Sequence, residues 1–166
     1  MNGTAPLRLH RARVVPEWID YNGHLSEAYY VLIFGHATDA LLDAIGMDGD
    51  FRTRTGRSVY TVDARIRYLG EVACGEEVEI RTWVCGADPK RMLVHHAMHR
   101  AGCHEPAART ELVLLSVAKP GPRAAPFDPA VFRTIRSLAE AGGACCPVLP
   151  DRWVPPSRQF NQEQGD

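Results

Sequence analysis

The chain has 166 residues, which is enough for one ordinary domain and leaves little room for a second. Its formal net charge is −1 and 45% of its residues are hydrophobic, a balance typical of a globular protein. Such a charge excludes the global positive field that would attract nucleic acid or an anionic membrane. An anionic ligand must therefore be met by a local cluster of basic residues.

Export from the cytoplasm is not indicated. No run approaches the ~20 apolar residues of a membrane span, and residues 1–10 hold no apolar core of signal-peptide length. The cysteine count is odd and contains no C-x-x-C pair, so neither a disulfide framework nor a zinc site is predicted, and reduced thiols are expected. The cysteines are Cys74, Cys85, Cys103, Cys145 and Cys146.

The first predicted element is a strand over residues 7–15, ended by a proline that cannot donate to a sheet. A turn-rich stretch follows, and residues 26–45 then take on helical spacing, with apolar side chains at steps of three and four. We predict a long helix buried on most sides, with Ser26 as N-cap and Gly46 in a left-handed C-terminal position. Gly35 inside it costs roughly 1 kcal/mol relative to alanine, so we expect another backbone to approach closely there.

An antiparallel meander of four strands is predicted after this helix. In the first of them, the apolar side chains from Tyr60 to Tyr68 are expected to share one face, with charged side chains on the other. The four strands cover residues 58–69, 77–85, 91–101 and 107–118. The histidines of the third strand would be spread over both faces, so no metal site is expected.

A small peripheral helix is predicted over residues 128–141, opening with Asp-Pro. The order of strand, buried helix, four strands and small helix predicts an α+β fold in which an antiparallel sheet wraps around one long central helix. We divide the chain into a flexible N-terminus (1–6), one domain that includes the C-terminal helix (7–142) and a Pro/Gly-rich tail (143–166).

The segment from Val15 to Tyr30 carries a resemblance to a known family; its sequence is V-P-E-W-I-D-Y-N-G-H-L-S-E-A-Y-Y. This segment resembles the active-site signature of hotdog-fold acyl-CoA thioesterases of the 4-hydroxybenzoyl-CoA thioesterase-like family. F-G-H-A-T-D-A-L-L at 34–42 and D-P-K-R at 88–91 are similar to the betainyl-CoA thioesterases of carnitine degradation. The resemblance covers roughly residues 8–118. It implies a hotdog fold and an acyl-CoA hydrolase, with betainyl-CoA as substrate and no cofactor, since coenzyme A is part of substrate and product.

The resemblance makes Asp20 the catalytic residue. Its carboxylate could attack the thioester carbonyl directly, giving an anhydride, or activate a water, and the sequence leaves both open. A third reading is that Asp20 only caps its turn. It lies just before the predicted helix, whose first N–H groups could receive the thioester oxygen. By resemblance the donor is the backbone N–H of Glu27, helped by Ala28.

Three neighbours complete the predicted catalytic loop. Gly23 lacks a Cβ, so the thioester could approach its backbone, although an ordinary turn glycine is the alternative. Asn22 could position a water or form a simple Asx turn. His24 is expected to fix the loop by hydrogen bonding rather than to carry a proton.

A betainyl group carries a quaternary ammonium with no proton to donate, so aromatic faces are expected to hold it. The predicted acyl-binding residues are Trp18, Tyr21, Tyr29, Tyr30 and Thr61. Trp18 and Tyr21, in the active-site loop, are favoured, because Tyr30 also lies on the apolar face of the helix that is expected to be buried. The Glu27 carboxylate could add electrostatic attraction for the cation.

Coenzyme A carries a 3′-phosphate and a diphosphate, which arginine and lysine bind well. The candidates are Arg65, Arg67, Lys90 and Arg91, although each alone could be a solvated surface charge.

A fold alone does not name a reaction, and rivals remain. They are a hydratase or acyl-carrier-protein thioesterase of the same fold, a thioesterase for another short or aromatic acyl-CoA, and a non-catalytic binder of acyl-CoA or of a quaternary ammonium metabolite. The family also implies a homodimer, or a tetramer of two dimers, that buries the open sheet edge and places the active site at the dimer interface.

Overall fold

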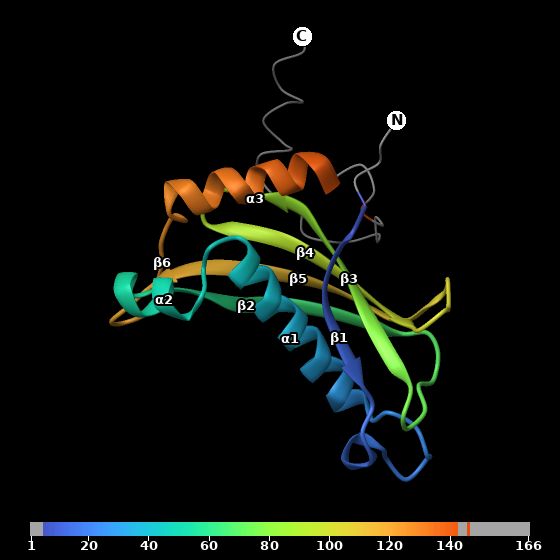
Figure 1. The fold of residues 1–166 in the computed structure, drawn as a ribbon. Helices are drawn as coiled ribbons and strands as arrows, with labels where there is room; N and C mark the ends of the chain where they lie inside the picture. The colour runs from blue at the N-terminus through green and yellow to red at the C-terminus, as the bar shows by residue number, and fades with distance from the viewer. Residues whose placement is uncertain (1–4, 143–145, 147–166) are drawn as a thin grey trace.

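The structure is a computed structural model that describes residues 5–142 and residue 146. Its sheet is antiparallel, with the strand order β1-β3-β4-β5-β2, and β6 pairs with β5. The strands are β1 (Leu7–Arg13), β2 (Arg57–Tyr68), β3 (Glu77–Ala87), β4 (Arg91–Arg100), β5 (Pro106–Ala118) and β6 (Arg123–Ala124). Figure 1 shows this sheet curving around α1 (Glu27–Ala44), while α3 (Pro129–Gly142) packs against β3. The predicted α+β architecture is confirmed.

The core lies between α1 and the sheet because one face of the helix is apolar throughout. Ile33, Ala37 and Leu41 are fully buried at helical spacing. Ser26 and Gly46 stand where predicted, as the N-cap and as a left-handed residue with φ +87° after the helix.

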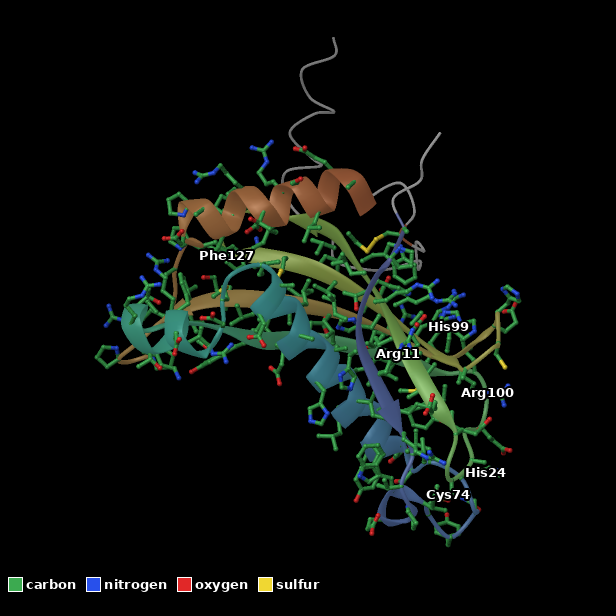
Figure 2. All side chains as sticks on the ribbon, viewed as in Figure 1. Arg11, His24, Cys74, His99, Arg100 and Phe127 are labelled. Atoms are coloured by element: carbon green, nitrogen blue, oxygen red, sulfur yellow. A yellow bond between two sulfur atoms is a disulfide. The ribbon has the colours of Figure 1, made fainter. Side chains whose placement is uncertain are left out.

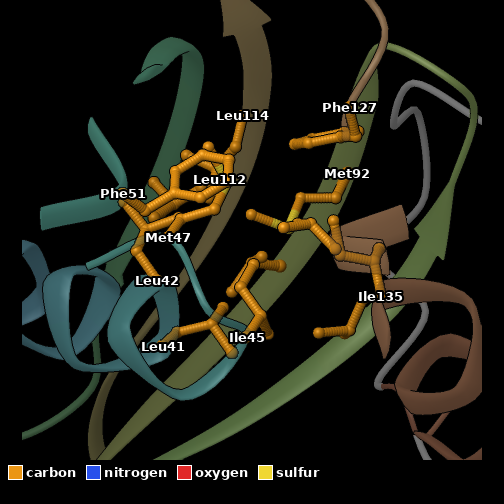
Figure 3. Close-up of a cluster of buried hydrophobic side chains, with 13 residues drawn as sticks. Leu41, Leu42, Ile45, Met47, Phe51, Met92, Leu112, Leu114, Phe127 and Ile135 are labelled. Atoms are coloured by element: carbon orange, nitrogen blue, oxygen red, sulfur yellow. The ribbon is translucent and has the colours of Figure 1, made fainter. Parts of the chain in front are cut away.

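A second short helix, α2 (Gly49–Thr55), was not predicted. The Asp48 carboxylate caps it by accepting the Phe51 N–H at 2.8 Å, and Phe51 enters the core cluster drawn in Figure 3. Seven residues are too few for a periodic apolar pattern to reveal a helix.

The prediction of a continuous four-strand meander is wrong. Only β3, β4 and β5 follow one another, while β2 pairs with β5 at the outer edge. β3 cannot take β2 as a neighbour because β1 and β4 already occupy its two sides. The connection over residues 69–76 therefore runs across the end of the sheet instead of forming a hairpin.

The face assignment within β2 is also wrong in part. The register with β5 shifts between Thr61 and Asp63, which places a bulge at Val62. Tyr60 therefore pairs with Leu115, whereas Tyr68 pairs with Ala108, seven residues away along β5. An odd offset puts these two tyrosines on opposite faces, since side chains alternate along a strand.

Two smaller expectations fail. A Cβ at Gly35 would meet no atom within 4 Å, so no close backbone accounts for this glycine. Cys85 and Cys146 form a disulfide with their Cα atoms 5.7 Å apart, contrary to the expected reduced thiols, because α3 brings the chain back along β3 over a separation of 61 residues. Cys74 and Cys103 are free. Apart from Cys146, the predicted tail, including Cys145, falls outside the described residues.

In the described part of the chain no single helix has the length and apolarity of a membrane span, and α1 with α2 reaches them together only across a 69° bend.

Candidate active site

The loop that holds Asp20 is closed at its base by a bridge between Ile19 and Leu25. Inside it the Asp20 N–H donates to the His24 carbonyl and the Gly23 N–H donates to the Asp20 carbonyl, each at 3.0 Å. Gly23 has φ +84°, a conformation that favours glycine. The turn therefore folds around Asp20, whose side chain is half-buried.

The Asp20 carboxylate has one oxygen committed to this turn. Oδ1 accepts the Asn22 N–H at 2.8 Å, which makes the Asx turn that the sequence allowed. This bond uses a single oxygen of the two and fixes the orientation of the carboxylate. Capping the turn and reacting with a substrate are therefore compatible.

Asp20 borders a cavity of about 630 Å³, which we call the acidic cavity. Its walls come from the Asp20 loop, the first turn of α1, the end of β2 and the loop that follows it. The lining residues are Asp20, Asn22, His24, Leu25, Glu27, Tyr30, Tyr68, Gly70 and Glu71. Three of them are carboxylates, and no arginine or lysine stands among these described lining residues. The cavity therefore has a negative character.

Two tyrosines supply the aromatic wall of the acidic cavity. The rings of Tyr30 and Tyr68 meet edge to face, with centroids 5.2 Å apart and planes at 83°. The Tyr30 hydroxyl donates to the Gly70 carbonyl at 3.1 Å, and that of Tyr68 to the Glu27 carbonyl at 3.4 Å. Burial raises the pKa of Tyr30, with Glu71 adding to the effect, and burial likewise raises the pKa of Tyr68, with Glu27 adding. Both phenols therefore remain protonated, and their neutral rings face a negative space.

His24 is held by a residue that the sequence did not single out. Its Nε2 lies 3.1 Å from Oε2 of Glu71, and the His24 backbone bridges to Ala73. Figure 2 shows His24 beside Cys74, where the Asp20 loop meets the loop before β3. These contacts agree with the predicted loop-fixing role of His24.

The first turn of α1 borders the same cavity. The Ser26 N–H donates to the Trp18 carbonyl at 2.9 Å, which ties the helix start to the short helix η1 (Pro16–Trp18). The first N–H groups of any α-helix lack intrahelical acceptors. In α1 these belong to Glu27 and Ala28, and Glu27 lines the cavity.

Other predicted acyl-binding residues lie outside the lining. Trp18 and Tyr29 stack on one another, with centroids 5.6 Å apart. Tyr21 is 97% exposed, and Thr61 is exposed on β2. Of the five, only Tyr30 is among the described residues that line the acidic cavity.

The predicted coenzyme A residues do not border the acidic cavity either. Arg91 pairs with Asp88 at 2.8 Å, and Asp88 also accepts the Lys90 N–H, so both are part of the β3–β4 turn. Arg65 and Arg67 pair in register with Glu111 and Arg109 of β5. Their role remains a prediction.

Sequence reasoning missed the far wall of the cavity, which is formed by Tyr68, Gly70 and Glu71. The resemblance covers roughly residues 8–118 and so includes this wall, but it assigned no role to these three residues. These residues are distant from Asp20 in the sequence, so their position beside it could be known only from the fold.

The histidines of β4 are dispersed as expected. His96 faces the core between Thr38 of α1 and Thr82 of β3, while His95 contacts Trp83 on the opposite face. Within residues 5–142 and 146, no group of three or more His, Cys, Asp or Glu side chains could hold a metal ion.

Comparison with known proteins decides the family. Residues 14–135 match the Thioesterase-like superfamily. The chain belongs to this superfamily. With the curved sheet around α1, membership identifies the protein as a hotdog-fold thioester hydrolase.

Individual relatives of this thioesterase-superfamily protein point the same way. It is 44% identical over 135 residues to "Betainyl-CoA thioesterase" of Pseudomonas aeruginosa, covering 81% of this chain and 85% of that one. It is 43% identical to "L-carnitine dehydrogenase/betainyl-CoA thioesterase" of Agrobacterium fabrum, of which it spans 27%. A crystal structure from Pseudomonas putida KT2440 superimposes with a TM-score of 0.76 at 39% identity, covering 92% of this chain and 97% of that chain.

Proposed function

We propose that this hydrolase cleaves betainyl-CoA to betaine and coenzyme A. The observation that carries the proposal is the acidic cavity, which combines three carboxylates with the rings of Tyr30 and Tyr68. A quaternary ammonium cannot be hydrogen-bonded, so negative potential and aromatic surface are the means of holding it. The similarity to betainyl-CoA thioesterases over most of both chains supports the same substrate.

Asp20 is the proposed reacting group. Its carboxylate either attacks the carbonyl carbon and expels the coenzyme A thiolate, leaving an anhydride that water then cleaves, or takes a proton from the water that attacks. The Asn22 N–H orients the carboxylate in both routes. The N–H groups of Glu27 and Ala28 would receive the negative oxygen, and one such donor typically lowers the barrier by about 3 kcal/mol.

The test compares betainyl-CoA with 3,3-dimethylbutyryl-CoA, in which a neutral quaternary carbon replaces the nitrogen at nearly the same shape. We expect betainyl-CoA to have the higher kcat/KM by at least about tenfold, the order of one cation–aromatic contact plus a nearby carboxylate. Each value is divided by the rate of uncatalysed hydroxide hydrolysis, because the cationic nitrogen itself activates the carbonyl.

Equal normalised values for the two compounds, or a preference for 4-hydroxybenzoyl-CoA, would remove betainyl-CoA as the substrate and leave a thioesterase for another acyl group. An absence of turnover with every acyl-CoA, with binding retained, would favour the non-catalytic binder. Betainyl-CoA arises inside cells, so the proposal places the protein in the cytoplasm, within carnitine degradation, and it requires no cofactor.

We also propose a homodimer formed through the edge strand β2. This strand has no partner beyond β5 among the described residues, and an open twelve-residue edge invites pairing. Exposed apolar side chains follow it: Tyr60, Val62, Tyr68 and Leu69. Pairing along β2 would bring a second chain next to Tyr68, at the wall of the acidic cavity. Basic residues of that second chain, such as its Lys90, could then reach the coenzyme A part of the substrate.

Light scattering after size exclusion tests this assembly. We expect a mass of two or four chains for the wild type and a shift toward one chain for Val62→Glu. Leu9→Glu, an exposed leucine on the opposite edge strand, is the matched control and should keep the wild-type mass. A wild-type protein of one-chain mass at micromolar concentration would contradict the dimer.

A further inference from the structure

A second cavity, of about 380 Å³, lies at the β1 side of the sheet, and we call it the arginine pocket. Its size falls within the about 300–1,000 Å³ typical of small-molecule sites. It is walled by β1, β3, the end of β4 and the turn that follows. Figure 2 shows Arg11, His99 and Arg100 gathered on this side of the molecule. Neither the proposed hydrolysis nor the coenzyme A candidates from the sequence uses any of these residues.

The arginine pocket is organised around one carboxylate. Glu79 receives Arg8 at 2.7 Å, Arg11 at 2.8 Å and Arg81 at 3.5 Å. Burial alone would raise the pKa of Glu79, yet hydrogen bonds from Arg11 and Arg81 and the charge of Arg8 bring it below its usual value, so the glutamate stays ionised. It therefore gathers three guanidinium groups around one carboxylate.

The donors of the arginine pocket outnumber its acceptors. Each guanidinium carries five N–H donors, and Glu79 offers two oxygens. Glu77 is the other carboxylate in the lining, so three guanidinium groups stand against two carboxylates around Glu79. This excess stands in a chain whose net charge is −1. The pocket is thus a local positive site.

One ring in the wall of the arginine pocket is buried and neutral. The His99 residue is 94% buried, and burial with the charge of Arg81 lowers the pKa of its imidazole, against hydrogen bonds to the backbone of Cys103 and His104 that raise it. A neutral imidazole has one N–H donor and one acceptor, so His99 adds hydrogen-bonding capacity beside the guanidinium groups.

We propose that the arginine pocket binds a phosphate group, with Arg8, Arg11 and Arg81 as its principal donors. A guanidinium group can bind two phosphate oxygens at once, and the ion pairs with Glu79 already bring Arg8, Arg11 and Arg81 to one place. The phosphate can belong to the nucleotide end of coenzyme A or to a free phosphorylated metabolite. The first case rests on the proposed function, and the second does not.

One arginine borders the arginine pocket and contacts a residue of the acidic cavity. Nη1 of Arg100, in the arginine pocket, donates at 3.3 Å to the carbonyl of Glu71, which lines the acidic cavity. A ligand with a cationic acyl end and a phosphorylated end would match the opposite charges of the two.

The first experiment measures binding of inorganic pyrophosphate by calorimetry at low salt, with no turnover involved. We expect the wild type to bind and Arg8→Gln/Arg11→Gln to bind at least about tenfold more weakly, since each charge-assisted hydrogen bond lost is worth about that factor. Both arginines are exposed on β1, so the fold should survive, which thermal unfolding checks. Arg133→Gln/Arg136→Gln on α3 removes the same charge elsewhere and should bind like the wild type.

The second experiment separates the two sources. If the site serves coenzyme A, Arg8→Gln/Arg11→Gln raises KM for the acyl-CoA substrate about tenfold with kcat nearly unchanged, and pyrophosphate inhibits competitively. If it serves a free metabolite, KM stays at the wild-type value and coenzyme A does not displace pyrophosphate. The proposal is overturned if the wild type binds no pyrophosphate at millimolar concentration, or if both double variants weaken binding equally.

Discussion

The acidic cavity and the arginine pocket lie near the same end of the sheet and have opposite charge. The acidic cavity is built from loops and element ends, where Asp20, Glu27 and Glu71 converge. The arginine pocket is built from side chains that alternate along paired strands, where Glu79 of β3 meets Arg11 of β1 in register. The difference teaches that alternation along a strand indicates which of its side chains share a face, whereas the elements that meet at a site are decided by the whole fold.

The largest expected effect separates chemistry from binding in the acidic cavity. Asp20→Asn should lower kcat by about 10²- to 10⁴-fold, because an amide neither attacks a thioester nor takes a proton from water. The asparagine oxygen can still accept the Asn22 N–H, so the melting temperature should stay near that of the wild type. The measurement is thiol release from betainyl-CoA, with Asp43→Asn on the exposed side of α1 as control. Turnover within tenfold of wild type would show that Asp20 only caps its turn.

A buried hydrogen-bonded network joins α1 to β3 and β4. The Thr38 hydroxyl donates to the Phe34 carbonyl at 3.0 Å, so Nε2–H of His96 must donate to the Thr38 oxygen, leaving Nδ1 to accept from Thr82 at 2.8 Å. These residues join α1, whose first turn borders the acidic cavity, to β3 and β4, which wall the arginine pocket.

Protonation of His96 should weaken this link. Burial, with His95 and His10 nearby, lowers the pKa of His96 from 6.5 to about 3. The unfolded chain therefore binds more protons between these values, and stability is lost as pH falls below 6.5. From pH 7 to 5 this one group contributes a loss of about 2 kcal/mol.

Urea unfolding at pH 7 and pH 5 measures that loss. His96→Gln keeps hydrogen-bonding groups but does not titrate, so it should lose about 2 kcal/mol less than the wild type over this interval. His104→Gln, exposed in the turn after β4, should behave as the wild type does. The same pH dependence in all three proteins would rule out His96 as the titrating group.

The charge of the acidic cavity predicts a smaller, substrate-specific effect. Glu71→Gln should reduce the preference for betainyl-CoA over its neutral isostere about fivefold, a value limited by the solvent exposure of this carboxylate. Glu105→Gln, in an exposed turn, should leave the ratio unchanged. An unaltered ratio in Glu71→Gln would assign cation recognition to the other carboxylates or to the rings.

The smallest expected effect concerns the aromatic wall. Tyr68→Leu should lower the same preference roughly threefold, because a half-exposed ring gives a modest cation–π contribution. Tyr60→Leu is the matched control, being a similarly exposed tyrosine on β2 that faces the other way. Equal losses in both variants would indicate a general effect on the strand.

Much of the site could be predicted from local sequence. The Asp20 turn, the glycine at Gly23 and the N-cap at Ser26 depend on contacts within a few residues, so the motif and the turn preferences of these residues predicted them. The far wall at Glu71 could not be predicted in the same way, because its approach to His24 depends on where the chain crosses the end of the sheet. The bulge at Val62 was missed for a related reason, since register is a property of two strands.

The sequence by itself determined the long buried helix, the alternating strands and the family motif. The first two follow from the periodicity of apolar residues, and the motif is a run of contiguous residues. Only the tertiary structure decided that β2 lies beside β5, that Cys85 meets Cys146, and that carboxylates gather in one cavity while arginines gather in another. The physical reason is that charge and cross-links act through space, and spacing along the chain does not report distances between elements that pair across the sheet.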